Sequence, residues 1–120
     1  MNMEICNQQL ESRKTKKTAA DRIIQYINTN FRSDITLDDL SEHVHLNKSY
    51  LIRLFKRQTG LSPMEYLQDY RLGYAEHLLL NTNMSISEIA FSCGYNSPSF
   101  FSVQFKRKFS VTPKEYRNNT

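Results

Sequence analysis

Residues 55–66 read FKRQTGLSPMEY, and residues 105–116 read FKRKFSVTPKEY. Six positions in these stretches are identical at a separation of fifty residues. They are Phe55, Lys56, Arg57, Pro63, Glu65 and Tyr66, which recur as Phe105, Lys106, Arg107, Pro113, Glu115 and Tyr116. Two copies are too few for a solenoid, which needs about three repeats to bury a continuous core. The sequence therefore predicts one small unit that is duplicated within a compact body.

The repeat continues upstream with a slightly different separation. Four residues have similar or identical counterparts forty-nine positions later: Leu37, Leu40, Leu46 and Asn47 correspond to Ile86, Ile89, Tyr95 and Asn96. The change of separation predicts one extra residue in the second copy, between Asn96 and Phe105.

Length and charge bound the class of protein. A chain of 120 residues normally forms one domain or two very small ones. Its net charge of +4 and its pI near 9.1 allow an acidic partner without requiring one. Residues 34–42 carry four acids and no base, whereas residues 47–64 carry four bases and no acid. Charge is thus sorted by segment.

The two cysteines, Cys6 and Cys93, lack the paired spacing of a zinc site. They indicate free thiols in a reducing compartment, with Cys93 a small core residue. No apolar run approaches the roughly 18 residues of a membrane span, and Met1–Leu10 lacks the long apolar stretch of a secretory signal. We therefore expect a cytoplasmic protein with no membrane partner.

Helical periodicity and capping residues place the first elements. Met1–Lys17 is polar and without an apolar stripe, which predicts a flexible basic arm. From about Thr18 an apolar face predicts a helix that closes near Asn28, Asn30 and Ser33; it comprises Ala20, Ile23, Ile24, Ile27 and Phe31.

A helix-turn-helix is predicted next. Thr36 can cap a short helix, and Asn47 can cap a second, basic helix that stops at Gly60. A brief turn through His45 and Leu46 separates them. The inward residues expected are Leu37, Leu40 and Val44 in the first helix, and Leu51, Leu54 and Phe55 in the second.

A long linker helix and the second copy follow. Ser62-Pro63-Met64-Glu65 is a capping box that starts a helix running to Asn81, with its apolar pattern at Met64, Leu67, Leu72, Ala75, Leu78 and Leu79. Gly73 inside it costs about 1 kcal/mol relative to alanine and is a candidate mark of close packing. Ser85-Ile86-Ser87-Glu88 and Ser97-Pro98 start the second pair of helices, and Thr112-Pro113-Lys114-Glu115 caps a last short helix ending near Arg117. The inward residues of the second basic helix should be Phe101, Phe105 and Phe109.

These elements predict an all-α fold of about seven helices, with two helix-turn-helix subdomains joined by a long linker helix. The expected divisions are a flexible basic arm at 1–17, a first subdomain at 18–60, the linker helix at 61–82 and a second subdomain at 83–118. The recognition helices should cover about 48–58 and 98–109.

Three stretches resemble the DNA-binding domain of the AraC/XylS family of bacterial transcription regulators. They are YLIRLFKRQTGLSPMEYL (50–67), RLGYAEHLL (71–79) and IAFSCGYNSPSFFSVQFKRKFSVTPKEYR (89–117). The resemblance covers about Ala19 to Asn118. It implies two helix-turn-helix modules that enter successive major grooves on one face of double-stranded DNA. A linker helix of this length spans on the order of 28 Å, comparable to the roughly 34 Å between adjacent major-groove sites.

The resemblance also assigns positions that read bases. In the first recognition helix these are Ser49, Ile52 and Arg53, with Tyr50 beside them; in the second they are Pro98, Ser99, Phe100, Ser102 and Val103. Arg53 is the sharpest candidate, because arginine can form paired hydrogen bonds to guanine. The second helix departs from better-known members, since no arginine, lysine, glutamine or asparagine occurs between Ser97 and Val103.

Phosphate contacts are expected from basic residues and from helix N-termini. Lys56, Arg57, Lys106 and Arg107 lie near the ends of the recognition helices, with Lys48 at the start of the first. Their alternative role is a solvated basic face. Asn47 and Ser97 serve as helix caps in any case, and a phosphate contact would be additional.

Other functions have weaker support. The three histidines, His43, His45 and His77, show no ligand or general-base spacing, and no nucleophile or phosphate loop is present, so we expect no enzyme, metal or cofactor. The main alternative is a helical protein-interaction module that docks acidic partners. An RNA-binding module is less favoured, because exposed stacking aromatics on a sheet have no place here. As a DNA binder the chain should act as a monomer, with RNA polymerase a further partner if it is an activator.

Overall fold

The computed structural model describes residues 17–119, and the regular structure in that range is entirely helical. Its seven helices are α2 (Ala19–Asn30), α3 (Leu37–Val44), α4 (Lys48–Thr59), α5 (Pro63–Asn81), α6 (Ile86–Ser92), α7 (Pro98–Phe109) and α8 (Pro113–Asn118). The predicted all-α architecture is confirmed. Cys6 and nearly all of the predicted basic arm fall at 1–16, outside the described residues. In the described part of the chain, no helix has the length and apolar character needed to span a bilayer.

Local capping explains most of the helix starts. Five helices begin with a reciprocal capping box, in which a serine or threonine and an acid three residues later satisfy each other's backbone N–H groups. The pairs are Thr18 with Asp21, Thr36 with Asp39, Ser62 with Glu65, Ser85 with Glu88, and Thr112 with Glu115. Helices α4 and α7 are capped by Asn47 and Ser97 alone. The expected start of every helix from α3 onward is therefore confirmed.

The repeated motif produces the same packing twice. From 51 to 66 and from 101 to 116, the classes buried, half-buried and exposed follow one another in the same order at every position. In both copies a buried phenylalanine meets the tyrosine of the next helix edge to face: Phe55 and Tyr66 lie 5.8 Å apart, and Phe105 and Tyr116 lie 5.6 Å apart. The shared residues of the motif thus specify how a recognition helix packs on the helix that follows it.

The extra residue of the second copy lies in the helix-turn-helix turn. The structural counterpart of the N-cap Asn47 is Ser97, fifty residues later, and not Asn96. The turn residues before it, His45 and Gly94, both have positive φ and are forty-nine residues apart. Asn96 is therefore the insertion, and the expected match of Asn47 with Asn96 is wrong.

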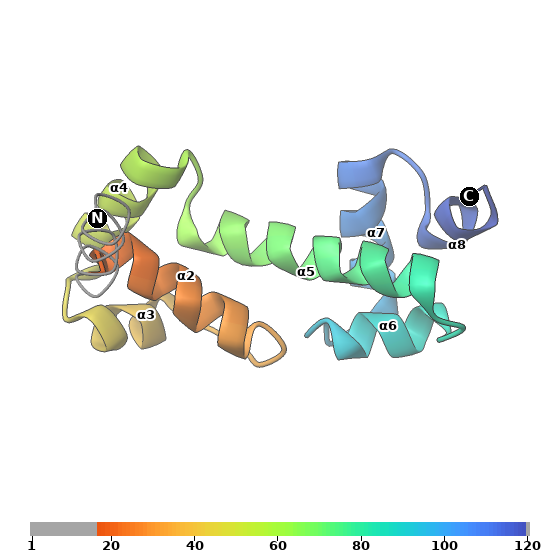
Figure 1. Ribbon diagram of the computed structural model, residues 1–120, viewed down its shortest axis with the longest axis horizontal. Coiled ribbons are helices and arrows are strands. Elements are labelled where there is room, and N and C mark those ends of the chain that lie inside the picture. The colour runs from red at the N-terminus through yellow and green to blue at the C-terminus, as the bar shows by residue number, and fades with distance from the viewer. Residues whose placement is uncertain (1–16, 120) are drawn as a thin grey trace, which may run out of the picture.

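Helix α5 belongs to both modules. We define the first module as α2 to α5 and the second as α5 to α8, because α5 packs on α2 and α4 in one and on α6 and α8 in the other. The Tyr66 hydroxyl lies 3.2 Å from the Oδ1 of Asn28 in α2, and the equivalent Tyr116 hydroxyl bonds to Glu76 in α5. In Figure 1, α5 runs through the centre with one module at each end.

Two apolar stripes on α5 hold the two modules. Leu67 lies in the first buried cluster, with Tyr66 and Tyr70 packed against it. The second cluster contains Leu72, Ala75, Leu78 and Leu79. At about 100° per residue the stripes are centred roughly 150° apart around the helix. Tyr74 packs against both clusters. The modules therefore sit on different faces of one helix.

Three details differ from expectation. Met64 is 37% exposed rather than inward, whereas the neighbouring Pro63 is fully buried. Four residues predicted as inward are only half-buried: Ile24, Leu37, Leu54 and Phe109. Gly73 does not mark close packing, since a Cβ atom added there would meet nothing within 4 Å.

Substitution by alanine should change stability in opposite directions at Gly60, the C-cap of α4, and at Gly73, inside α5. Both positions have open space around an added Cβ atom, but Gly60 has φ +83° and Gly73 is helical. We expect Gly73→Ala to raise the free energy of unfolding by about 1 kcal/mol. Gly60→Ala should lower it by about 1–2 kcal/mol, because its φ lies in the left-handed region. Urea denaturation of each variant measures both values, and a loss of stability in Gly73→Ala would contradict the open environment.

Candidate nucleic-acid interface

The exposed face of α4 carries most of the predicted contact residues of the first module. Ser49, Tyr50 and Arg53 are exposed, as are Lys56 and Arg57 one turn further on. Ile52 is half-buried and packs against the first core cluster. The exposed side of α4 therefore runs from Ser49 to Arg57, with Arg53 at its middle.

The exposed face of α7 is apolar at its start and basic at its end. Phe100 is 53% exposed and Val103 is 56% exposed, although both are large apolar side chains. Ser99 is exposed, whereas Pro98 and Ser102 are half-buried. Lys106 and Arg107 are exposed in the last turns. Phe101 and Phe105 are fully buried and hold α7 on its core. This packing does not account for the exposure of Phe100 and Val103 on the opposite side.

The N-termini of α4 and α7 differ electrostatically from those of the other described helices. Within residues 17–119, these are the two helices without an acidic side chain in the first turn. The Asn47 side chain accepts a hydrogen bond from the Tyr50 amide at 2.8 Å, and the Ser97 hydroxyl accepts one from the Phe100 amide at 3.2 Å. The positive end of each helix dipole is therefore not neutralised by an acid of its own first turn, which favours a bound anion.

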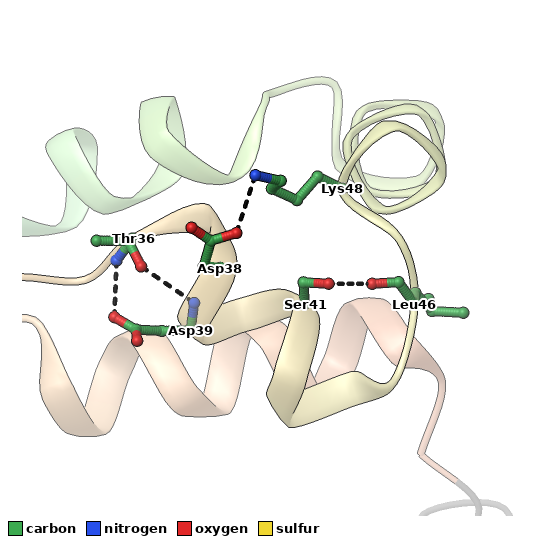
Figure 2. A network of polar contacts seen from close by, with 6 residues as sticks. All are labelled: Thr36, Asp38, Asp39, Ser41, Leu46 and Lys48. Carbon is green, nitrogen blue, oxygen red and sulfur yellow. Dashed lines mark hydrogen bonds and ion pairs between the residues drawn. The ribbon is translucent and has the colours of Figure 1, made fainter.

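An ion pair ties the start of α4 to α3 (Figure 2). Lys48 Nζ lies 2.9 Å from the Asp38 carboxylate, and both side chains are mostly exposed. The same view shows the turn between the helices, where the Ser41 hydroxyl donates to the Leu46 carbonyl. His45 adopts φ +57° in this turn. Lys48 therefore has an intramolecular partner, and an approaching phosphate would compete with Asp38 for it.

Five other predicted contact residues differ from Lys48 in this respect. In the described part of the chain, no carboxylate forms an ion pair with the predicted contact residues Arg53, Lys56, Arg57, Lys106 and Arg107. Lys108 pairs with Asp69 of α5 at 3.2 Å. This lysine was not among the predicted contacts, and its pairing depends on tertiary packing that sequence spacing does not reveal.

The remaining reactive groups have structural roles. Cys93 is fully buried in the second core, as expected, and burial raises the pKa of its thiol to about 12. His43 packs on Tyr26, with ring centroids 4.8 Å apart, and His77 contacts Asn81. Over residues 17–119, no group of three histidine, cysteine or acidic side chains could hold a metal ion.

Comparison with known proteins shows which family has this arrangement of helices. A family model described as a helix-turn-helix domain matches residues 40–119. The lactose operon transcription activator of Staphylococcus xylosus is 38% identical over 96 residues, which cover 80% of this chain and 34% of that protein. The chain therefore spans about a third of the length of this relative.

Two solved structures share the fold. The C-terminal domain of AraT, a response regulator from Geobacillus stearothermophilus, superposes with a TM-score of 0.83 at 34% identity, covering 87% of each chain. A transcriptional regulator with an AraC-type DNA-binding domain from Chromobacterium violaceum gives a TM-score of 0.77 at 31% identity, covering 83% of this chain and 89% of that one. The fold and the two exposed helices thus define a helix-turn-helix domain. The chain belongs to the AraC/XylS family.

Removing the carboxylate of Asp38 should strengthen binding to any duplex. Asp38→Asn releases Lys48 and removes repulsion near the start of α4, so we expect affinity to rise about threefold and the salt slope to steepen by about 1. Stability should hardly change, because an exposed ion pair contributes about 0–1 kcal/mol. Fluorescence anisotropy at several salt concentrations measures both effects.

Glu42→Gln is the matched control, since it changes net charge equally and lies on the same helix, exposed. Equal gains in the two variants would show that net charge acts and that Lys48 makes no phosphate contact.

Proposed function

We propose that this chain binds a specific duplex DNA sequence by placing α4 and α7 in two successive major grooves and thereby regulates transcription. The observation that supports it most is the pair of like modules, each exposing a recognition helix without an acid in its first turn. The molecule extends over 51 Å along its longest axis, which exceeds the roughly 34 Å between successive groove sites. The C-terminal ends of α4 and α7 both lie above α5 in the view of Figure 1.

Arg53 would carry the sharpest base recognition of the first module. It is exposed, lies in the middle of α4 and has no acidic partner among residues 17–119. A guanidinium so placed can donate two hydrogen bonds to guanine O6 and N7. Ser49 and Tyr50 flank it on the same exposed face, whereas Ile52 contributes less because it packs against the core.

The second module would read DNA mainly through apolar contacts and shape. Phe100 and Val103 project from α7 with more than half of their surfaces exposed. Apolar side chains can contact the methyl group of thymine, and Ser99 and Ser102 can bond to several bases. A preference for A·T-rich, deformable sequence should result. Lys106 and Arg107 would hold the helix on the phosphates.

Further partners follow from this function. The S. xylosus relative is a transcription activator by name, and we extend that role to this chain, with RNA polymerase as the second partner. Both recognition helices belong to one chain, so a monomer suffices for an asymmetric site. A chromosomal target places the protein in the cytoplasm. We assign it no catalytic activity and no cofactor.

Selection of bound duplexes from a random pool tests the proposal. We expect one enriched asymmetric sequence whose affinity falls steeply with salt, because phosphate contacts release counterions. No enriched duplex, together with capture of an acidic protein, would instead support a protein-interaction module.

Substitution should separate base contacts from phosphate contacts on α4. Arg53→Ala should cost about 1–3 kcal/mol on the selected duplex and little on mismatched ones. Lys56→Ala should weaken binding to all duplexes alike and lower the salt slope by about 1. Anisotropy titrations with matched and mismatched duplexes measure these differences. If both variants act equally on both duplexes, Arg53 is a phosphate contact.

The two half-sites should differ in how strictly their base sequence is recognised. Scrambling the first half-site should lose more specificity than scrambling the second, because no arginine, lysine, glutamine or asparagine lies between Ser97 and Val103 to form paired hydrogen bonds to a base edge. Phe100→Ala and Val103→Ala should likewise cost less specificity than Arg53→Ala on the selected duplex. Competition binding with scrambled duplexes measures each loss, and a larger loss in the second half-site would reverse the assignment.

A further inference from the structure

The two modules touch each other directly as well as through α5. Gly94, in the turn before α7, lies against the end of α2 in the first module. A Cβ atom added to Gly94 would be 2.5 Å from the Phe31 carbonyl oxygen and 3.1 Å from Arg32 Cα. Real Cβ atoms do not approach that closely. The turn that positions the second recognition helix therefore abuts the backbone of the first module, and only glycine permits this contact.

Arg71 of α5 joins the same two segments. Its Nε donates to the Phe31 carbonyl at 2.8 Å, and its Nη2 donates to the Ser33 carbonyl at 2.8 Å. Phe31 is the C-cap of α2 and Ser33 lies just after it, so the guanidinium sits at the C-terminal end of that helix, where backbone acceptors lack helical partners and favour a positive charge. The guanidinium also lies 5.7 Å from the centroid of the Tyr95 ring, in the second module. One side chain thus contacts both modules.

Both segments are themselves held firmly. The Phe31 ring packs on Tyr70 and Tyr74 of α5, with centroids 4.9 Å and 5.1 Å away. Tyr95 is buried, and its hydroxyl donates to Gln68 of α5 at 2.7 Å. A displacement of either module about α5 would break the contacts of Arg71.

We propose that Arg71 and Gly94 set the relative orientation of the two recognition helices and so make the chain select the spacing between its half-sites. Arg71 is a positioning residue in this role. The consequence for DNA rests on the proposed function. One added base pair shifts the second half-site by about 3.4 Å and rotates it by about 35°, which a locked pair of modules cannot follow. Lysine cannot replace arginine fully, because its ammonium lacks the planar fork that binds two carbonyls and stacks on a ring.

The orientation can be measured without DNA. Nitroxide labels at Glu42→Cys in α3 and Lys114→Cys in α8 report the distance between modules by pulsed electron resonance, in a Cys6→Ser background. Cys93 is fully buried and stays unlabelled. We expect one narrow distance distribution in the parent, a broadened one in Arg71→Leu and in Gly94→Ala, and an intermediate one in Arg71→Lys.

Gly60→Ala is the matched control for Gly94→Ala. Both glycines have positive φ, but the Cβ position at Gly60 is open. Backbone strain should therefore lower stability in both variants, whereas the clash with Phe31 should broaden the distance distribution only in Gly94→Ala. Circular dichroism confirms folding, and Arg71→Leu remains informative if Gly94→Ala does not fold. An unchanged, narrow distribution in folded Arg71→Leu overturns the proposal.

The DNA consequence needs the selected duplex with one base pair added or removed between half-sites. The parent should lose about tenfold in affinity, or about 1.4 kcal/mol, and Arg71→Leu should lose less than about threefold. Equal spacing preference in the two proteins overturns the proposal even if Arg71→Leu is less stable. A parent that binds no duplex specifically would refute the proposed function instead, while the distance measurement still decides the orientation.

Discussion

One helix, α5, must satisfy two hydrophobic cores at once, and the rest of the structure depends on this constraint. Its first stripe closes the first module through Leu67, and its second stripe opens the second module through Leu72 and Ala75. The same helix therefore replaces α2 in the second copy. Because the stripes face different directions, the register of α5 determines where each recognition helix lies. A duplicated unit thus becomes one body without a flexible linker.

Much of this fold could be predicted, because its signals are local. Capping residues and prolines next to apolar stripes predicted the bounds of α5 without error. The position of the inserted residue could not be predicted, since the identity of Asn47 and Asn96 conceals that the cap of α7 is Ser97. The role of Gly94 was equally hidden. The sequence pattern of a glycine at a helix end is the same whether its surroundings are open, as at Gly60, or occupied by the backbone of another module, as at Gly94.

In the candidate interface, too, some features could be predicted from the sequence and others could not. The basic ends of the recognition helices are visible in the sequence, as is the lack of acidic residues in their first turns. This lack becomes significant only when the described helices are compared, because the other five each have an acid there. The half-burial of Ile52 and Ser102 depends on small rotations of each helix on its core. The pairing of Lys48 with Asp38 depends on the angle between α3 and α4. Side chains at the edge of a face need tertiary structure, whereas Arg53 at its centre does not.

The central claim is that two unequal reading helices, held by α5, occupy successive grooves on one face of the duplex. Hydroxyl-radical footprinting of a saturated complex on the selected duplex tests it most directly. The account predicts two protected segments about 10 base pairs apart on the same face, occupied by one chain. A single protected segment, or two segments on opposite faces, would contradict it.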